Sequence, residues 1–276
     1  MVKKSKKVII TVAPVCHTEK PVPEGCRNPL TPEAVANEII SCARAGASMV
    51  HLHTRDDRGL QTSDLKHFSK TLDLFSAETD IVIQGSTGGL ADLSLEERCT
   101  CLNEPKVEVA SLNMGSVNFG EGVYINTLPD IRYWAKRMKE TDVMPELECF
   151  DLSMIETSLN MAREGILDSP LHFNFCFNIK GALSANLKTL ACLSALVENE
   201  SHWGVTCDSM QDLSFLAGAV SMGASVIRVG FEDSFYYGPG RIATSNTRLV
   251  EEAAGMVTSL GFELATPEEA RNMLGL

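Results

Sequence analysis

The sequence predicts a (β/α)8 TIM barrel, a closed ring of eight parallel strands surrounded by eight helices, formed as one domain over residues 1–276. Short apolar runs alternate with longer amphipathic runs along the whole chain, eight of each, with no linker rich in proline, glycine or serine between them. Such alternation requires parallel strands joined by helical crossovers. The length of 276 residues also suits a fold that typically needs about 250. The count of eight favours the closed barrel, and an open doubly wound sheet is the alternative.

The strands are the short apolar runs. The first begins at Lys7 and ends before Pro14, which cannot donate to a β ladder. The remaining runs have the same apolar character, and each is followed by polar residues or glycine. We expect strands at residues 7–13, 48–53, 81–86, 107–113, 146–150, 171–177, 203–207 and 226–231.

The helices are the longer runs with apolar residues at helical spacing. The first shows the signals most clearly, because Thr31 suits the N-cap, Pro32 suits the first helical position and Gly46 ends the helix. The same unit then repeats, and a short closing helix opens at Thr266. We expect the eight barrel helices to begin near Thr31, Ser63, Ser94, Pro129, Ser153, Asn186, Gln211 and Asn246.

Composition limits the class of protein. With 24 basic and 36 acidic residues the net charge is −12, which argues against nucleic-acid binding through a basic face. The short basic cluster at residues 3–7 is expected to be a solvated N-terminus. No stretch approaches the roughly 20 apolar residues of a membrane span. The nine cysteines contain no CxxC pair, which indicates reduced thiols and a cytoplasmic location.

A candidate metal site lies at the ends of the second and eighth strands, where barrel enzymes place their chemistry. His51 and His53 project to the same side of a strand, because successive residues alternate faces. Two imidazoles at this spacing can share one ion; the alternative is a pair of hydrogen-bonded interior histidines. We expect Glu232 to be the third ligand and Asp233 to pair with Arg228. An ion pair between Arg228 and a carboxylate at the rim is the simpler interpretation, and both can hold together.

Other polar residues occur at the expected strand ends. Glu146 and Glu148 share one face of the fifth strand, and Ser111 shares a face of the fourth strand with Asn113. The loop at residues 86–89, Ser-Thr-Gly-Gly, is typical of a backbone nest for an anion, and equally of a tight turn.

Together these segments resemble the β-keto acid cleavage enzymes. The resemblance covers essentially the whole chain and rests on His51-Leu52-His53, Ser86-Thr87-Gly88-Gly89, Ser111-Leu112-Asn113 with the following Gly115–Gly120, Pro145-Glu146-Leu147-Glu148, and Arg228-Val229-Gly230-Phe231-Glu232-Asp233. It implies a homo-oligomer, with a tetramer favoured, that binds one Zn²⁺ and uses acetyl-CoA as co-substrate. The implied reaction condenses a β-keto acid with acetyl-CoA and releases acetoacetate and a new acyl-CoA by retro-Claisen cleavage.

The resemblance also implies a role for each matching residue. The metal ligands would be His51, His53 and Glu232. The substrate contacts would be Ser86, Gly89, Ser111 and Asn113. The catalytic residues would be Arg228, Asp233 and Glu148.

Three loops depart from the family pattern. They follow the first, sixth and seventh strands, at residues 14–19, 178–182 and 207–210. In the family an acid in the first of these loops recognises a substrate amino group, and here the matching position is either Thr18 or Glu19. These loops therefore leave the acyl group, and the use of CoA itself, undetermined by the sequence.

Two other kinds of protein remain as alternatives. A metal-dependent barrel hydrolase or aldolase would act on a small carboxylate; hydrolases of the amidohydrolase type carry their His-x-His pair on the first strand and further histidines on the fifth and sixth. Here the pair is on the second strand and His172 stands at the start of the sixth. A non-catalytic barrel relic would have lost its costly interior charges, whereas Arg228, Glu232 and Asp233 are all present.

Overall fold

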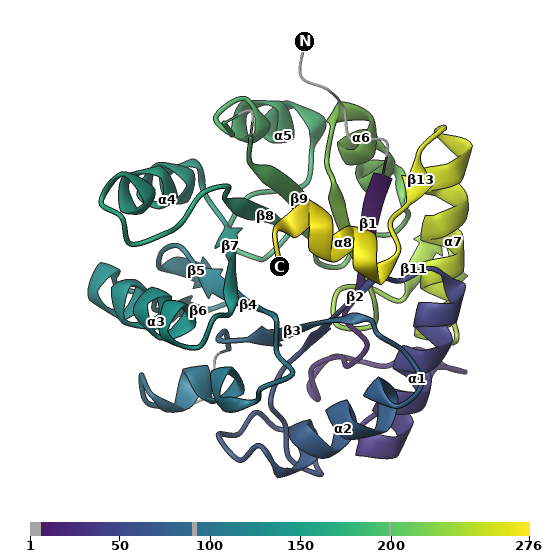
Figure 1. Ribbon diagram of the computed structural model, residues 1–276. Coiled ribbons are helices and arrows are strands. Elements are labelled where there is room, and N and C mark those ends of the chain that lie inside the picture. Colours follow the sequence, from purple (N-terminus) through teal and green to yellow (C-terminus); the bar gives the residue numbers. More distant parts are fainter. Residues whose placement is uncertain (1–6, 90–92, 199) are drawn as a thin grey trace.

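Eight parallel strands form a closed barrel in the computed structural model, which describes residues 7–89, 93–198 and 200–276 (Figure 1). Except for Lys7, the basic N-terminal cluster lies outside the described residues. The barrel closes because β1 pairs with β10 as well as with β2. The predicted TIM barrel is thus confirmed. Its strands are β1 (Lys7–Val12), β2 (Met49–Leu52), β3 (Val82–Ser86), β4 (Val109–Asn113), β7 (Met144–Cys149), β8 (His172–Phe177), β9 (His202–Cys207) and β10 (Val226–Val229).

Helices surround this ring and follow the strands in order (Figure 1). The predicted N-cap is confirmed at Thr31, whose side chain accepts a hydrogen bond from the backbone of Ala34. Several helices begin up to three residues away from the expected start. The α-helices around the barrel are α1 (Pro32–Ala45), α2 (Lys66–Ser76), α3 (Leu128–Glu140), α4 (Leu152–Arg163), α5 (Leu187–Ser194), α6 (Ser214–Met222) and α7 (Asn246–Ser259).

The helix expected from Ser94 is wrong in type. The segment after β3 forms a 3-10 helix, η1 (Glu97–Asn103), with a kink at Cys99, where φ is −105° and ψ is 21°. It cannot extend further, because Glu104 precedes a proline and is extended, with φ −93° and ψ 113°. The Cys-Thr-Cys stretch inside it has a poor helix propensity.

The N-terminal end of the barrel is closed by the C-terminal segment. Strand β13 (Glu263–Leu264) pairs with the start of β1, and helix α8 (Pro267–Leu274) then crosses the end of the barrel (Figure 1). Thr266 and Glu269 form a capping box at the start of this helix. The predicted start of the closing helix at Thr266 is therefore confirmed. Its apolar face completes a separate small core with Ile9, Met49, Val82, Val109, Val226, Ala265, Ala270 and Leu274.

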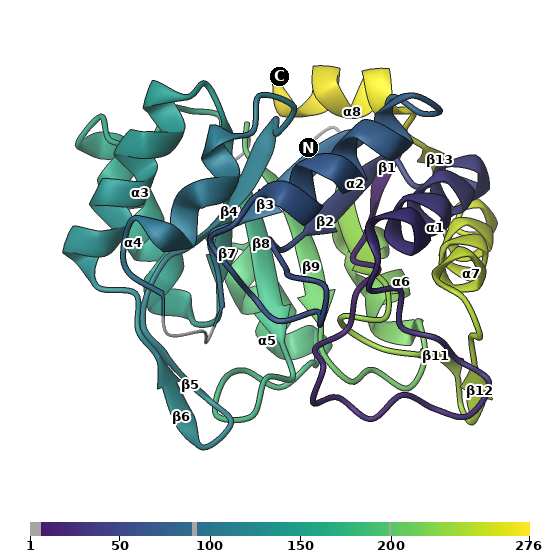
Figure 2. The same ribbon diagram turned by 90° about the horizontal axis from the view of Figure 1, so that it is seen from below.

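Two small hairpins lie at the opposite end, away from α8 (Figure 2). Strands β5 (Val117–Phe119) and β6 (Gly122–Tyr124) form the first, and β11 (Tyr236–Gly238) and β12 (Arg241–Ile242) form the second. The sequence did not predict them, because strands of two or three residues are too short to show an alternating pattern. Both hairpins follow the C-terminal ends of barrel strands, so they border the region where barrel enzymes bind substrates.

The barrel interior is apolar at the end covered by α8 and polar further towards the C-terminal ends of the strands. Two residues further along each strand from the small core, six strands carry buried polar side chains. Barrel interiors are normally filled by branched apolar residues, and buried charge is costly unless it is paired or bound. A polar interior therefore indicates a functional site. These side chains are Thr11, His51, Gln84, Ser111, Glu146 and Arg228.

Two further expectations concern the chain as a whole. All nine cysteines are free thiols, as the sequence indicated. Within the described ranges, none of the helices has the length and apolar character needed to cross a membrane.

Candidate metal centre and active site

The three predicted metal ligands meet at the C-terminal end of the barrel. His51 and His53 come from the end of β2, and Glu232 lies in the turn after β10. The Oε1 atom of Glu232 is 3.6 Å from Nε2 of His51 and 3.5 Å from Nε2 of His53. One ligand atom from each residue lies within 4.8 Å of the other two. Among the described residues this is the one cluster of three or more such groups that could hold an ion.

The chemistry of this donor set fits zinc. Burial, followed by the charge of Arg228, lowers the pKa of His51 to about 3, so its imidazole is neutral and can offer a lone pair at neutral pH. Burial raises the pKa of Glu232, but His53, His51 and Arg228 outweigh it and hold that pKa well below its usual range. Two histidines and one carboxylate are a common ligand set of catalytic zinc sites, which keep a further position open.

Arg228 and Asp233 form a buried ion pair beside these ligands, as the sequence predicted. The guanidinium donates to both carboxylate oxygens of Asp233, from Nε at 2.8 Å and from Nη2 at 2.5 Å. Its Nη2 also donates to Glu232 at 3.3 Å. Burial raises the pKa of Asp233, and the charge and hydrogen bonds of Arg228 oppose that rise. One cation therefore holds both carboxylates in place.

A sharp turn brings both acids over the barrel. Gly230 has φ 142°, and a Cβ there would lie 2.2 Å from the carbonyl oxygen of Ala13, so only glycine fits. The backbone N–H groups of Asp233 and Ser234 both donate to the carbonyl of Gly230. Lys20, from the loop after β1, donates to the carbonyls of Glu232 at 2.8 Å and Asp233 at 2.6 Å. Sequence reasoning missed Lys20, since nothing in its local sequence marks such a contact.

The two glutamates of β7 both point into the barrel. Glu146 and Glu148 are 2% and 9% exposed. Burial raises the pKa of Glu148 to about 8; Arg228 opposes the rise, and the acids around it, Glu146, Glu232 and Asp233, add to it. Glu148 is therefore largely protonated at pH 7 and can donate a hydrogen bond.

The raised pKa of Glu148 has a consequence for stability. Below pH 4.5, its ordinary pKa, the carboxyl group is neutral in both the folded and the unfolded chain. Between 4.5 and about 8 only the unfolded chain loses the proton, so rising pH favours unfolding. We expect the melting temperature of chelator-treated Glu148→Gln to exceed that of wild type by a margin that grows across this window and then levels off. The exposed Glu156→Gln should show no such trend, and a margin for Glu148→Gln that is flat with pH would contradict the prediction.

The predicted substrate contacts lie together on neighbouring strands. Ser86 at the end of β3 and Ser111 on β4 have their hydroxyl oxygens 3.2 Å apart. The backbone N–H of Gly88 donates to the hydroxyl of Ser86 at 3.1 Å, and the hydroxyl of Thr87 donates to the carbonyl of Ser111 at 2.6 Å, which holds the glycine loop against β4. All of these groups are buried at the same end of the barrel as the histidines.

Gly89 and Asn113 share a partner that the sequence did not reveal. The backbone N–H of Gly89 and the side-chain amide of Asn113 both donate to the hydroxyl of Tyr124, at 2.8 and 2.9 Å. Arg98 adds a third donor at 3.3 Å, and its guanidinium stacks on the rings of Tyr124 and Trp134. Tyr124 belongs to the β5–β6 hairpin, so the hairpin is tied directly to the predicted substrate contacts.

Replacing Tyr124 with phenylalanine should destabilise the protein measurably. The change leaves the buried amide of Asn113 and the half-buried N–H of Gly89 without their acceptor, and an unsatisfied buried donor costs about 1–3 kcal/mol. We expect the free energy of unfolding in urea to fall by roughly that amount. Tyr133→Phe on α3 is the matched control, because its hydroxyl makes no hydrogen bond with the residues that the structure describes. Equal stability of the two variants would contradict this account of Tyr124.

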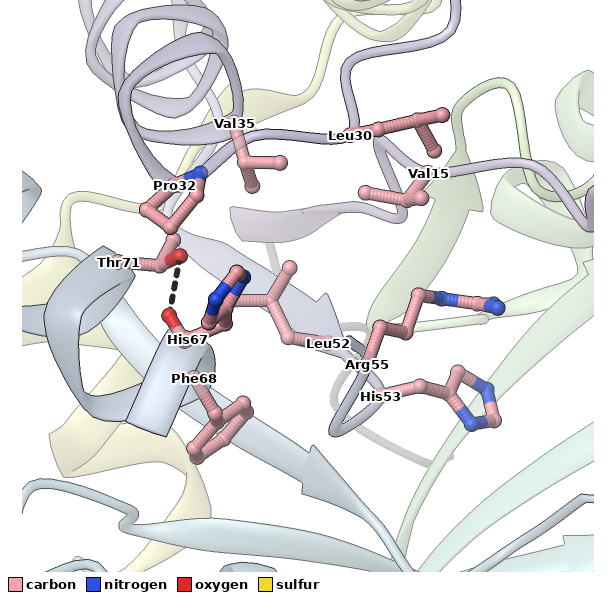
Figure 3. Close-up of a pocket in the computed structure, with 10 residues that line it drawn as sticks. All are labelled: Val15, Leu30, Pro32, Val35, Leu52, His53, Arg55, His67, Phe68 and Thr71. Carbon is pink, nitrogen blue, oxygen red and sulfur yellow. Dashed lines mark hydrogen bonds between the residues drawn. The ribbon is translucent and has the colours of Figure 1, made fainter. Parts of the chain in front are cut away.

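A small pocket lies beside His53, between β2 and the helices α1 and α2 (Figure 3). His53 and Arg55 stand at one edge, and apolar side chains such as Leu30, Val35 and Leu52 line much of the rest (Figure 3). Its volume of about 30 Å³ holds one water molecule and no substrate. The pocket is therefore a packing feature beside His53 and is too small to be the substrate site.

Comparisons with known proteins show what this chain is similar to. A family model described as beta-keto acid cleavage enzyme matches residues 7–276. The chain is 37% identical to the 3-keto-5-aminohexanoate cleavage enzyme of Acetoanaerobium sticklandii, over 98% of this chain and 99% of that protein. It is 32% identical to the 3-dehydrocarnitine:acetyl-CoA trimethylamine transferase of Rhizobium meliloti, over 99% and 97%. Among solved structures, ObcA with a C4-CoA adduct and oxalate matches with a TM-score of 0.76, at 22% identity over 90% of this chain and 67% of that one.

Proposed function

The chain belongs to the β-keto acid cleavage enzyme family, and from this premise we propose that it is a zinc-dependent enzyme that transfers an acyl group from a β-keto acid to CoA. The observation that carries the proposal is the convergence of His51, His53 and Glu232 on one point, with the Arg228–Asp233 pair beside them. The names of relatives that contain acetyl-CoA support it as the co-substrate.

The proposed reaction exchanges acyl groups between a carbon and a sulfur. The C2 carbon of the β-keto acid gives up a proton and forms a bond to the acetyl carbonyl carbon, and the CoA thiolate leaves. The thiolate then attacks the original ketone carbon, the bond between that carbon and C2 breaks, and C2 regains its proton. Acetoacetate and the new acyl-CoA are the products, with no net oxidation or reduction.

Asp233 is proposed as the general base that takes the C2 proton. Two hydrogen bonds from Arg228 fix the orientation of its carboxylate. Its pKa is raised by burial, which makes it a better proton acceptor than an ordinary aspartate. Because C2 regains a proton at the end, the same carboxyl group can return it.

The metal ligands would be His51, His53 and Glu232. A Zn²⁺ ion held there would act as a Lewis acid that polarises the ketone and stabilises negative charge on its oxygen. His51 is buried and the other two residues are half-buried, and the hydrogen bond from Arg228 to Glu232 holds that carboxylate in place before substrate arrives.

The remaining predicted residues would bind and orient the substrate. The hydroxyls of Ser86 and Ser111 lie side by side and can donate to a carboxylate. Gly89 and Asn113 would contribute from the adjoining loop and strand, in a position set by Tyr124. Glu148, protonated near neutral pH, would donate a hydrogen bond or pass a proton to the reacting group.

Two loops bear on which acyl group the enzyme would transfer. Thr18 and Glu19, the two candidates for the family's recognition position, are both exposed. In the loop after β8, Lys180 forms an ion pair with Glu121 of the β5–β6 hairpin turn.

We propose a cytoplasmic homo-oligomer, in keeping with the family resemblance.

The test is to incubate the zinc-loaded protein with acetyl-CoA and a panel of β-keto acids that vary in chain length and charge. Mass spectrometry then follows the CoA thioesters. We expect a new acyl-CoA to form together with an equal amount of acetoacetate. If zinc is bound and no member of the panel yields a new thioester, the proposed transfer is wrong, and aldol cleavage or hydrolysis of a small carboxylate becomes the function to test.

A further inference from the structure

The imidazole of His51 contacts one further buried side chain, that of Gln84, which is not among the predicted metal ligands. Its Nδ1 atom lies 2.9 Å from Oε1 of Gln84, on the neighbouring strand β3. The two residues are 1% and 0% exposed, so water does not compete for this contact. A neutral imidazole that offers Nε2 to an ion carries its proton on Nδ1, and that proton needs an acceptor. The oxygen of Gln84 is in the position to accept it.

One hydrogen bond orients the Gln84 amide among the described residues. Its Nε2 atom is buried and has no hydrogen-bond partner there. Glu146 is near enough for the Gln84 amide to oppose the rise in pKa that burial causes, but its carboxyl group is held by Asn174, which donates to Oε1 at 3.0 Å. The contact with Nδ1 of His51 is therefore what holds the oxygen of Gln84 against the imidazole.

His53 has no comparable support. Its Nδ1 atom is 3.3 Å from Nε2 of Gln61, and the same Gln61 nitrogen donates to the carbonyl of Gly88. His53 and Gln61 are both partly exposed, whereas His51 and Gln84 are buried. The orientation of His51 is therefore the more strongly determined of the two.

We propose that Gln84 is a positioning residue of the metal site, which fixes the His51 tautomer so that Nε2 faces Glu232. This inference rests on the proposed zinc site. It assigns to Gln84 a role in metal affinity that is separate from any contact with substrate. Outer-shell partners of this kind typically change metal affinity by about 10- to 100-fold.

The first experiment measures zinc affinity by competition with a chromophoric chelator. We expect Gln84→Met to weaken zinc binding about 10- to 100-fold and to change the visible spectrum of the Co²⁺-substituted protein. The double variant Gln84→Glu with Glu146→Gln exchanges the two groups, keeps the total charge and again places an acceptor against Nδ1 of His51. We expect it to recover most of the lost affinity. The exposed Gln211→Met is the matched control and should bind zinc as wild type does.

A second measurement uses the unaltered protein. Two-bond ¹H–¹⁵N correlation spectra of the metal-free chain report which ring nitrogen of His51 carries the proton. We expect Nδ1 to be protonated and Nε2 to be bare.

The outcomes separate the two proposals. A wild-type protein that binds no zinc would remove the metal centre itself. A wild-type protein that binds one zinc, together with a Gln84→Met variant of equal affinity and unchanged Co²⁺ spectrum, would overturn only the role of Gln84. A proton on Nε2 of His51 would overturn it independently of any variant.

Discussion

Replacing His51 with alanine is expected to remove bound zinc and turnover together. Two ligands would remain, Glu232 and the less rigidly held His53, and catalytic zinc sites typically need three. Loss of a Lewis acid that supplies several kcal/mol of transition-state stabilisation corresponds to a rate decrease of roughly 10³-fold or more. Zinc content after gel filtration and the rate of acyl-CoA formation should both fall.

The matched control for this variant is His67→Ala. His67 lies on α2, beside the small pocket and outside the metal cluster. This variant should keep one zinc per chain and near-normal turnover. If His51→Ala also keeps one zinc per chain, the ion is bound elsewhere and the assignment of the three ligands fails.

Replacing Asp233 with asparagine is expected to have the opposite combination of effects, with zinc retained and turnover lost. The amide has the shape of the carboxyl group, so the turn after β10 and the position of Glu232 should persist. It cannot accept a proton from carbon, however, and general bases typically contribute about 10²- to 10⁴-fold to the rate. We expect kcat to fall within that range, measured as acyl-CoA formed by the zinc-loaded protein.

Stability has to be followed in the same variant, because Arg228 loses its full ionic partner. Glu232, at 3.3 Å from Nη2, remains as a second partner for the guanidinium. Asp212→Asn, in the exposed loop before α6, is the control and should leave both zinc content and kcat unchanged. An Asp233→Asn enzyme with unimpaired kcat would exclude Asp233 as the base.

The two variants also discriminate between functions. A hydrolase or aldolase that used the same metal site and the same base would lose activity in both variants. Its wild-type products, however, would not include a new thioester. A barrel without catalytic activity would lose zinc in His51→Ala and show no turnover in any form. Product analysis of the wild-type protein therefore has to accompany both measurements.

The sequence by itself determined the architecture and the ends of the strands. Apolar runs of the right length, separated by amphipathic helices, leave few alternatives to a barrel, because each helix must bury its apolar face on the parallel sheet. The two-residue period of a strand placed His51 and His53 on one face. A charged residue at the end of a buried strand, such as Glu232, indicated a site because such a position is costly without a partner.

Only the tertiary structure decided how these residues are held. Gln84 reaches His51 from a different strand, Tyr124 reaches Gly89 and Asn113 from a short hairpin, and Lys20 reaches the turn after β10 from the loop after β1. None of these partners is near in sequence to the group that it holds, and none produces a local pattern. The periodicity of the sequence predicts which face of a helix or strand is buried. Which residue a buried side chain then contacts depends on the strand register and on the closure of the barrel.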